Sequence, residues 1–143
     1  MAERQLGLFA GKRQRGVTVK DRTSEFALQC QVADALRDWC RPDWRYTAIP
    51  LGEHRTKATA ARLKRGGVIA GWPDFMLLHC TGRMVWLELK RPAVKASPSH
   101  GAQEDLSAFI GDCHGHRYIC TNNLRDALDL LRDAGVLRIR VSA

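Results

Sequence analysis

The stretch GWPDFMLLHCTGRMVWLELK, residues 71–90, is the centre around which the rest of the chain is organised, because it is typical of two apolar strands joined by a tight turn. A three-residue loop that ends with Gly82 in the left-handed conformation would pair Asp74 with Glu88 at the open end of this hairpin. Side chains alternate along a strand, so Glu88 and Lys90 point to the same face, roughly 7 Å apart. The stretch therefore predicts three charged side chains at one end of a sheet.

Two carboxylates that face each other across a hairpin repel. With side chains about 5 Å apart and an effective dielectric constant near 20, the repulsion between Asp74 and Glu88 is on the order of 3 kcal/mol. A divalent cation would offset it, and carboxylate oxygens with water suit Mg²⁺ or Mn²⁺ better than Zn²⁺. Lys90 would then lie where it contacts a phosphate or orients a water. The alternative is an exposed pair between an aspartate and a lysine, which contributes little to stability.

The same residues carry a resemblance to a known nuclease superfamily. Pro73-Asp74, followed after a strand's length by Glu88-Leu89-Lys90, resembles the PD-(D/E)xK signature. The run HRTKATAARLKRGGVIAGWPDF, residues 54–75, together with LELKRP and a downstream Gln103, resembles the virus-type replication-repair nuclease (VRR-NUC) branch of that superfamily. The resemblance covers most of the chain.

This resemblance implies a restriction-endonuclease-like core, in which a mixed central β-sheet is flanked by helices on both faces. It also implies hydrolysis of phosphodiester bonds in DNA with Mg²⁺ or Mn²⁺ as the cofactor. Asp74 and Glu88 would hold the metal together with the carbonyl of Leu89. Lys90 would position or deprotonate the attacking water, and Gln103 would orient Lys90 or a phosphate oxygen.

The remaining elements alternate between helix and strand, which indicates an α/β domain. The pattern predicts helices over about 24–40, 56–65, 98–112 and 123–134, and further strands over 45–50, 117–121 and 136–141. Both faces of the central hairpin are apolar, so the sheet must be covered on both sides. The side chains expected to face the core from the first and third helices are Leu28, Val32, Leu36, Trp39, Leu106, Phe109 and Ile110.

The charge balance points to a polyanionic partner. The 143 residues include 23 basic and 15 acidic ones, which gives a net charge of +8. No apolar run long enough to span a membrane is visible. Basic side chains concentrate on one predicted helix with a thin apolar face, and we expect this helix to lie on the domain with its basic side toward phosphates. A merely solvated surface is the alternative. These side chains are Arg55, Lys57, Arg62, Lys64 and Arg65.

Two glutamates are candidates for a further metal ligand. Glu25 begins the first predicted helix, where a carboxylate ordinarily complements the helix dipole. In the family that this chain resembles, a glutamate of the first helix points to the metal cluster, and Glu25 is the matching position. Both interpretations stay open. Glu53, which precedes the basic helix, is a second candidate for the same role.

The cysteines and histidines also allow a different interpretation. Five irregularly spaced cysteines indicate reduced thiols inside a cell, and nothing resembles a secretory signal peptide, so we expect a cytoplasmic protein. Cys113, His114, His116 and Cys120 invite a zinc site, but they lack the paired CxxC spacing of structural zinc sites. A loop with buried thiols is favoured.

Residues 1–20 are typical of a flexible basic tail, and residues 21–143 of a single nuclease domain. The tail segment Gln5-Leu6-Gly7-Leu8-Phe9 resembles the short peptide with which bacterial replication and repair proteins bind the sliding clamp. The alternative is that its three large apolar side chains dock on the domain. Clamp binding is therefore a hypothesis.

A structure-specific endonuclease for branched DNA is the function that the resemblance implies. Standalone single-domain members of this branch resemble resolvases of four-way (Holliday) junctions in replication, repair and recombination, so a homodimer is expected. The alternatives are a flap-type nuclease, a restriction-like enzyme and a DNA-binding module of the same fold that has lost catalysis. Asp74, Glu88 and Lys90 disfavour the silent module, because binding alone does not need paired carboxylates that repel phosphate.

Overall fold

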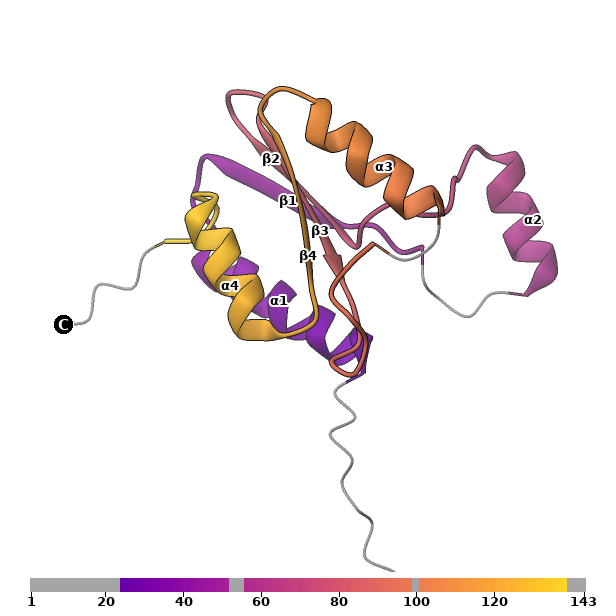
Figure 1. Ribbon diagram of the computed structural model, residues 1–143, viewed down its shortest axis with the longest axis horizontal. Helices are drawn as coiled ribbons and strands as arrows, with labels where there is room; N and C mark the ends of the chain where they lie inside the picture. The colour runs from indigo at the N-terminus through magenta and orange to yellow at the C-terminus, as the bar shows by residue number, and fades with distance from the viewer. Residues whose placement is uncertain (1–23, 52–55, 99–100, 139–143) are drawn as a thin grey trace, which may run out of the picture.

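A computed structural model describes residues 24–51, 56–98 and 101–138 (Figure 1). These residues form four helices around a four-stranded mixed sheet, so the predicted α/β class is confirmed. None of the described helices has the length and apolar character that crossing a membrane requires. The elements are α1 (Glu25–Trp39), β1 (Trp44–Ala48), α2 (Lys57–Arg65), β2 (Phe75–His79), β3 (Met84–Leu89), α3 (Gly101–Asp112), β4 (His116–Thr121) and α4 (Leu124–Asp133).

The central hairpin has the predicted register. Strands lie in the order β1-β2-β3-β4, with antiparallel pairing from β1 to β3 and parallel pairing between β3 and β4. Phe75 pairs with Leu87, and the hairpin loop has three residues and ends at Gly82, whose φ is 87°. Continued by one residue, this register places Asp74 opposite Glu88. The local prediction for the hairpin is confirmed.

One face of the sheet forms the core of the protein. α1 and α4 lie on this face, whereas α3 lies on the other (Figure 1). Alternate residues of β2 and β3 point toward α1 and α4, as the two-residue period of a strand requires. The residues buried here include Leu28, Val32, Leu36, Phe75, Leu77, Val85, Leu87, Leu89, Ile119, Ala127 and Leu131.

The opposite face of the sheet is covered only in part. α3 packs on β4 and buries Ile110, but Leu78 of β2 is 43% exposed. The expectation that helices cover both faces of the hairpin is therefore met only in part. Phe109 is 67% exposed, so the inward orientation predicted for it is wrong. Successive helical residues are turned by about 100°, and a helix resting on one strand covers only the narrow stripe that includes Ile110.

The apolar stripe of α1 continues to Cys40, the residue directly after the helix, rather than to Trp39. Leu28, Val32 and Leu36 are buried as predicted, but Trp39 is 40% exposed. A spacing of four residues continues this stripe to Cys40, which packs against the core. Trp39 lies to one side of the stripe, so its predicted place in the core is wrong.

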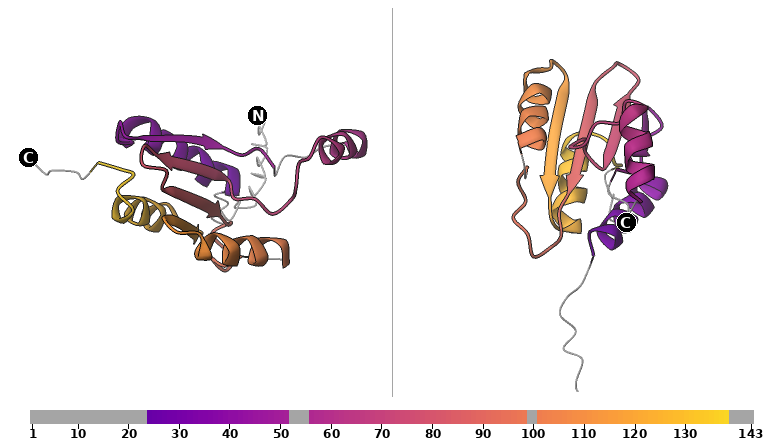
Figure 2. Two further views of the ribbon diagram at one scale, coloured as in Figure 1. Left: turned by 90° about the horizontal axis from the view of Figure 1, so that it is seen from above. Right: turned by 90° about the vertical axis from the view of Figure 1, so that its right-hand side faces the viewer.

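α2 is an arm that projects from the rest of the molecule (Figures 1 and 2). None of its residues is buried, so the expectation that it lies on the domain is wrong. Thr56 caps its first turn by accepting a hydrogen bond from the N–H of Thr59. The apolar residues of α2 are three alanines and Leu63, which offer little area to bury against the domain.

The C-terminal part differs from the prediction as well. Val136 and Leu137 are buried, but among the described residues Leu137 forms only an isolated antiparallel bridge with Cys40. The rest of the predicted strand, residues 139–141, lies outside the described residues. α3 begins at Gly101, later than the predicted start at residue 98.

Candidate active site

Asp74 connects the ends of three strands at one end of the sheet. Its Oδ2 accepts a 2.7 Å hydrogen bond from the backbone N–H of Leu89 at the end of β3. Its backbone carbonyl accepts a 2.7 Å hydrogen bond from the N–H of Ile49, which follows β1. Burial raises the pKa of the Asp74 carboxyl to about 7, and repulsion from Glu88 and Glu25 adds to the increase. The hydrogen bond from Leu89 therefore holds the Asp74 carboxyl close to other negatively charged side chains.

Glu88, Lys90 and Gln103 form a hydrogen-bonded network in which each residue contacts the other two. Lys90 Nζ donates to Oε1 of Glu88 and to Oε1 of Gln103, at 2.7 Å in both cases. Gln103 Nε2 donates to the same Oε1 of Glu88, also at 2.7 Å. Glu88 is 5% and Lys90 7% exposed, so the two charges neutralise each other away from bulk water. The sequence predicts Glu88 and Lys90 on one face, and Gln103, which the resemblance links to Lys90 or to a phosphate oxygen, contacts both residues.

Gln103 reaches the strands because α3 begins against the loop that precedes Asp74. Gly71 has a φ of +94°, and a Cβ built on it would lie 3.1 Å from the Cβ of Ala102. A glycine is required here for both its backbone conformation and its lack of a side chain. This contact fixes the first turn of α3 beside the sheet end, and the next residue of α3 is Gln103.

Glu25 lies near the cluster without a hydrogen bond to it from any described residue. It is the first residue of α1 and is exposed. Its charge contributes to the raised pKa of Asp74, so the two carboxylates are within electrostatic reach. The position also complements the helix dipole, so both interpretations of Glu25 remain compatible with the structure. Glu53, the other candidate ligand, lies outside the described residues.

The donor set of this cluster fits a hard divalent cation. Oδ2 of Asp74 and Oε1 of Glu88 accept hydrogen bonds, whereas Oδ1 of Asp74 and Oε2 of Glu88 accept none from a described residue. The described part of the chain contains no group of three or more histidine, cysteine or acidic side chains arranged around one point. Mg²⁺ is often bound through one or two carboxylates while it keeps several waters. The two carboxylates therefore fit Mg²⁺ or Mn²⁺ rather than an ion that needs a full protein cage.

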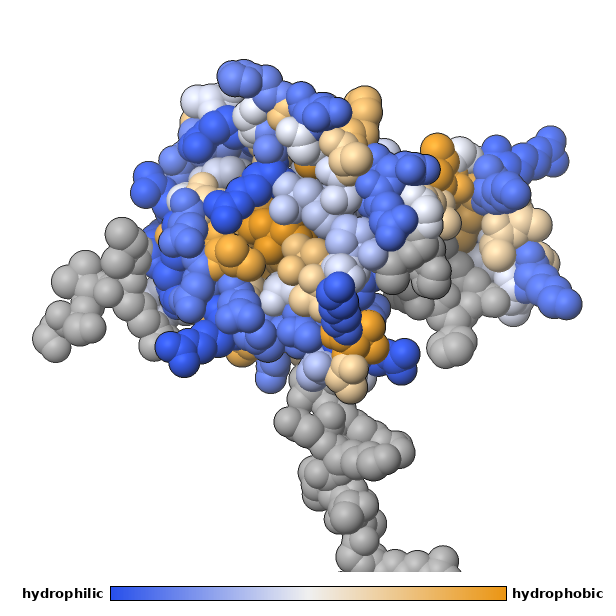
Figure 3. All heavy atoms as spheres, in the orientation of Figure 1, coloured by the Kyte–Doolittle hydropathy of each residue, from blue (hydrophilic) through white to orange (hydrophobic). Residues whose placement is uncertain are grey.

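The four predicted DNA-binding residues that the structure describes lie on the arm and not beside the carboxylates. Hydrophilic side chains project from α2 in Figure 3, and its basic residues Lys57, Arg62, Lys64 and Arg65 are exposed. Arg55 lies outside the described residues. The structure thus separates the basic helix from the carboxylates, and the loop of residues 66–73 connects the two.

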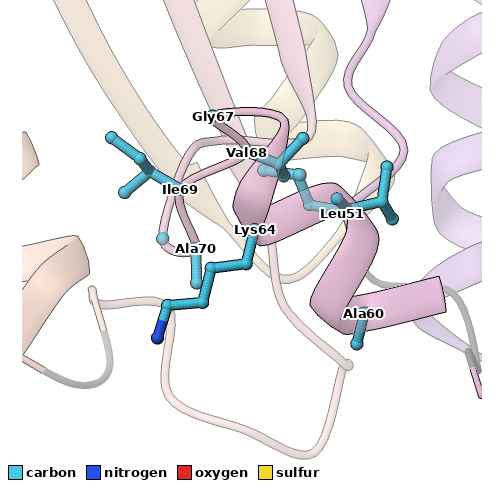
Figure 4. A pocket seen from close by; sticks show the side chains of 9 residues that line it. Leu51, Ala60, Lys64, Gly67, Val68, Ile69 and Ala70 are labelled. Atoms are coloured by element: carbon cyan, nitrogen blue, oxygen red, sulfur yellow. The ribbon is translucent and has the colours of Figure 1, made fainter. Parts of the chain in front are cut away.

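A mostly apolar pocket of about 770 Å³ lies beside α2, and neither carboxylate lines it (Figure 4). Its walls come from α2, from the following loop and from Leu51, with Lys64 as the charged side chain. The pocket ends at Gly71, which is also the residue in contact with α3. The arm and the carboxylate cluster are therefore joined through this loop.

Tyr118 and Cys120 are neighbours of the site that the sequence did not indicate. β4 pairs in parallel with β3, and Cys120 lies opposite Glu88. Burial raises the pKa of the Cys120 thiol to about 11, and it also raises the pKa of the Tyr118 hydroxyl; Glu88 and Asp74 contribute to both increases. The Tyr118 hydroxyl is buried without a hydrogen-bond partner among the described residues. No local pattern reveals which strand pairs with β3, so no sequence signal could have found these residues.

Cys113 and Cys120 are half-buried, so the expectation of buried thiols near the end of α3 is met only in part. Nδ1 of His116 accepts a 3.4 Å hydrogen bond from Nε1–H of Trp86, and Cys120 lies within β4. The five cysteines of the chain are free thiols in the structure.

No protein-family model, curated protein or solved structure matches this chain. Its function is therefore inferred from its own residues and their geometry.

Proposed function

We propose that this protein is a metal-dependent nuclease that hydrolyses phosphodiester bonds in DNA, with a restriction-endonuclease-like core of the VRR-NUC type. The observation that carries the proposal is the convergence of Asp74, Glu88, Lys90 and Gln103 at one end of the sheet. These are the four residues to which the resemblance assigns catalytic roles. A cluster of two carboxylates, a lysine and an amide, in which Glu88 and Lys90 are buried, is costly to fold, which favours a chemical role.

Asp74 and Glu88 would hold Mg²⁺ or Mn²⁺, with the Leu89 carbonyl and Glu25 as further ligands. A bound ion would lower the pKa of a water and offset negative charge on the phosphate. The hydrogen bond from the N–H of Leu89 keeps the Asp74 carboxylate turned toward the end of β3. This bond orients the carboxylate before any ligand arrives.

Lys90 would orient the attacking water and stabilise a phosphate oxygen. Its Nζ is held 2.7 Å from both Glu88 and Gln103, so the ammonium group is fixed beside the carboxylates. An ammonium has three N–H donors, and a phosphate oxygen is a suitable acceptor for such a group. Gln103 would act as the positioning residue for Lys90, because it contacts both members of the ion pair.

The arm would supply contacts to the DNA backbone. α2 has nine residues, and helices of this length are marginal in water on their own. None of its residues is buried, and none of its basic side chains forms an ion pair with a described acidic residue. Phosphates would neutralise these charges and hold the arm against the substrate.

A catalytically silent DNA-binding module is the second candidate, and one observation favours it. Glu88 Oε1 accepts hydrogen bonds from both Lys90 and Gln103, so the network neutralises its own charges without a cation. In such a module the cluster would serve only to join α3 to the sheet. The module would bind DNA through α2 and cleave nothing.

A homodimer is part of the main proposal, because symmetric cleavage of two strands of a four-way junction requires two active sites. Light scattering in solution tests it, and a monomeric mass with and without junction DNA would contradict it. The clamp peptide, residues 5–9, lies outside the described residues and stays a prediction. A pull-down with a bacterial sliding clamp tests it, and equal retention of the Leu8→Ala, Phe9→Ala double variant and the wild type would contradict it.

Cleavage of labelled DNA tests the function itself. The substrates are a four-way junction, a flap, a nicked duplex and a single strand, each with Mg²⁺, Mn²⁺ or EDTA. We expect metal-dependent cleavage that is lost in Asp74→Ala and in Lys90→Ala. Binding without cleavage under every metal would favour the silent module. Equal cleavage by the wild type and both variants would point to a contaminating nuclease.

A further inference from the structure

Trp72 presents part of an indole ring directly before the carboxylate cluster. It is 37% exposed and lies two residues before Asp74. Two residues of chain span at most about 7 Å, so the backbone of Trp72 lies within that distance of the backbone of Asp74. None of the catalytic roles described above uses this residue.

The ring of Trp72 rests on a fixed support. Its centroid lies 5.3 Å from that of Trp86, at an interplanar angle of 57°. Trp86 is 7% exposed, and its Nε1–H donates a 3.4 Å hydrogen bond to Nδ1 of His116. The residue before Trp72, Gly71, fits against Ala102 with no space for a side chain. An aromatic face held in this way loses little conformational entropy when a ligand stacks on it.

The basic helix that precedes this ring in the chain favours a nucleic acid as its ligand. The loop that carries Trp72 begins at α2, a helix with four basic and no acidic residues. Proteins bind single-stranded nucleic acid with aromatic rings that stack on bases and basic side chains that follow the phosphate backbone, and here one loop carries the ring and continues from the basic helix. A single partly exposed indole ring is small for an interface with another protein, which buries about 800 Å² on each partner.

We propose that Trp72 stacks on an unpaired base next to the phosphate held at Asp74 and Glu88. The preferred substrate is then DNA with unpaired nucleotides at the cleavage point, such as a flap, a single strand or the open centre of a junction. In continuous duplex each base is stacked between its neighbours, and its face is not free. The position of the phosphate rests on the proposed nuclease function, whereas the stacking itself requires no cleavage.

Binding in EDTA tests the stacking without any chemistry. The full-length chain is titrated into a labelled oligo-dT strand and into a duplex of the same length. We expect Trp72→Ala to weaken binding of the single strand roughly 5- to 150-fold, as for the loss of one stacked base, and to change duplex binding less than about twofold. Trp72→Phe should retain most of the affinity, because a phenyl ring also stacks. Trp39→Ala, which removes an exposed tryptophan of α1, is the matched control and should change neither affinity.

Two measurements separate stacking from a structural role of Trp72. Trp72→Leu fills the space over Trp86 without an aromatic face and should bind the single strand as weakly as Trp72→Ala. Oligo-dT should quench the fluorescence of the wild type more than that of Trp72→Phe. Equal weakening of single strand and duplex by Trp72→Ala, or wild-type affinity of Trp72→Leu, would overturn the proposal and leave Trp72 as packing or as a contact for another protein.

An abasic scan locates the stacked base. A single abasic site is moved along the strand, and one position should weaken binding by the wild type but not by Trp72→Ala. The cleavage assay on the same strands keeps the two proposals apart. If the wild type cleaves nothing but the abasic effect persists, the nuclease proposal fails and stacking stands. If the wild type cleaves but no position depends on Trp72, stacking fails and the nuclease stands.

Discussion

The backbone N–H of Leu89 lies 2.7 Å from Oδ2 of Asp74, so the last residue of β3 orients the carboxylate that precedes β2. This bond favours the ionised carboxylate, but burial and the neighbouring acidic residues outweigh it, and the pKa rises to about 7. A carboxyl with a pKa in this range changes its charge near neutral pH. The stability of the protein should therefore depend on pH through this residue.

Asp74→Asn should stabilise the protein at high pH in the absence of divalent cations. The pKa of Asp74 is about 7 in the folded state against an ordinary 3.8. Between pH 3.8 and about pH 7 the folded state therefore keeps a proton on Asp74 that the unfolded state has lost. The free energy of unfolding consequently falls as pH rises through this window. At about pH 8 the variant should gain up to a few kcal/mol over the wild type, and at about pH 4 almost nothing. Urea unfolding at both pH values measures this.

Asp38→Asn is the matched control for that experiment, because Asp38 is an exposed aspartate of α1. It should alter stability by less than about 0.5 kcal/mol at both pH values. A wild type whose stability rises between pH 4 and pH 7, together with an Asp74→Asn variant that is destabilised at pH 8, would contradict the assignment of this pKa.

Mg²⁺ or Mn²⁺ should raise the unfolding temperature of the wild type. An ion that binds only the folded state stabilises it by about 2.7 kcal/mol at a hundredfold excess over its Kd. Asp74→Asn and Glu88→Gln each remove one charged ligand and should lose most of this effect. A thermal melt with and without the ion provides the measurement, and K⁺ at matched ionic strength is the control. Equal shifts in all three proteins would place the ion elsewhere.

Lys90→Met should destabilise the protein strongly, because it leaves the charge of Glu88 buried without its partner. Removal of one member of a buried ion pair costs roughly 3–5 kcal/mol. Lys90→Met combined with Glu88→Gln should recover most of this loss, since no buried charge then remains. Chemical unfolding of the two variants gives the comparison. A double variant no more stable than Lys90→Met would show that packing by Lys90, and not its charge, is what matters.

Gly71→Ala should be more harmful than Gly67→Ala. Both glycines have a positive φ, of +94° and +92°, so an alanine at either position costs roughly 1–2 kcal/mol in backbone strain. A Cβ on Gly71 would also meet Ala102 at 3.1 Å, whereas nothing lies within 4 Å of a Cβ on Gly67. The difference in unfolding free energy isolates the contact with α3. Because this contact positions Gln103, DNA cleavage should fall further in Gly71→Ala, and equal activities would argue against the contact.

Neutralising one charge on α2 should weaken DNA binding and its salt dependence together. Each phosphate contact contributes about 0.9 to the slope of log K against log salt concentration for duplex DNA. Arg62→Ala should therefore lower the slope by about one unit, with little effect of DNA sequence. Arg125→Ala on α4, whose side chain is 92% exposed, is the control and should leave the slope unchanged. An unchanged slope for Arg62→Ala would remove α2 from the DNA interface.

Local sequence alone determined the central hairpin and half of the candidate site. The three-residue loop ending at Gly82 and the alternation of apolar residues fix the register, because turn geometry and the two-residue period act between neighbours in the chain. Asp74 therefore faces Glu88 whatever surrounds the hairpin, and Lys90 follows on the same face. The helix caps at Ser24, Thr56 and Asn123 are local in the same sense, because each side chain accepts a hydrogen bond from a backbone N–H three residues further on.

The surroundings of Asp74, Glu88 and Lys90 depend on tertiary packing. The contact of Gly71 with Ala102 brings Gln103 to Lys90, and parallel pairing brings β4 beside Glu88. The positions of α2 and Phe109 depend on how much apolar area each helix can bury against the sheet, and a residue pattern does not contain that comparison. Periodicity is read from neighbouring residues, whereas packing depends on the apolar area that every element can bury against the others. The sequence could therefore name the catalytic candidates, but not the network or the aromatic surface around them.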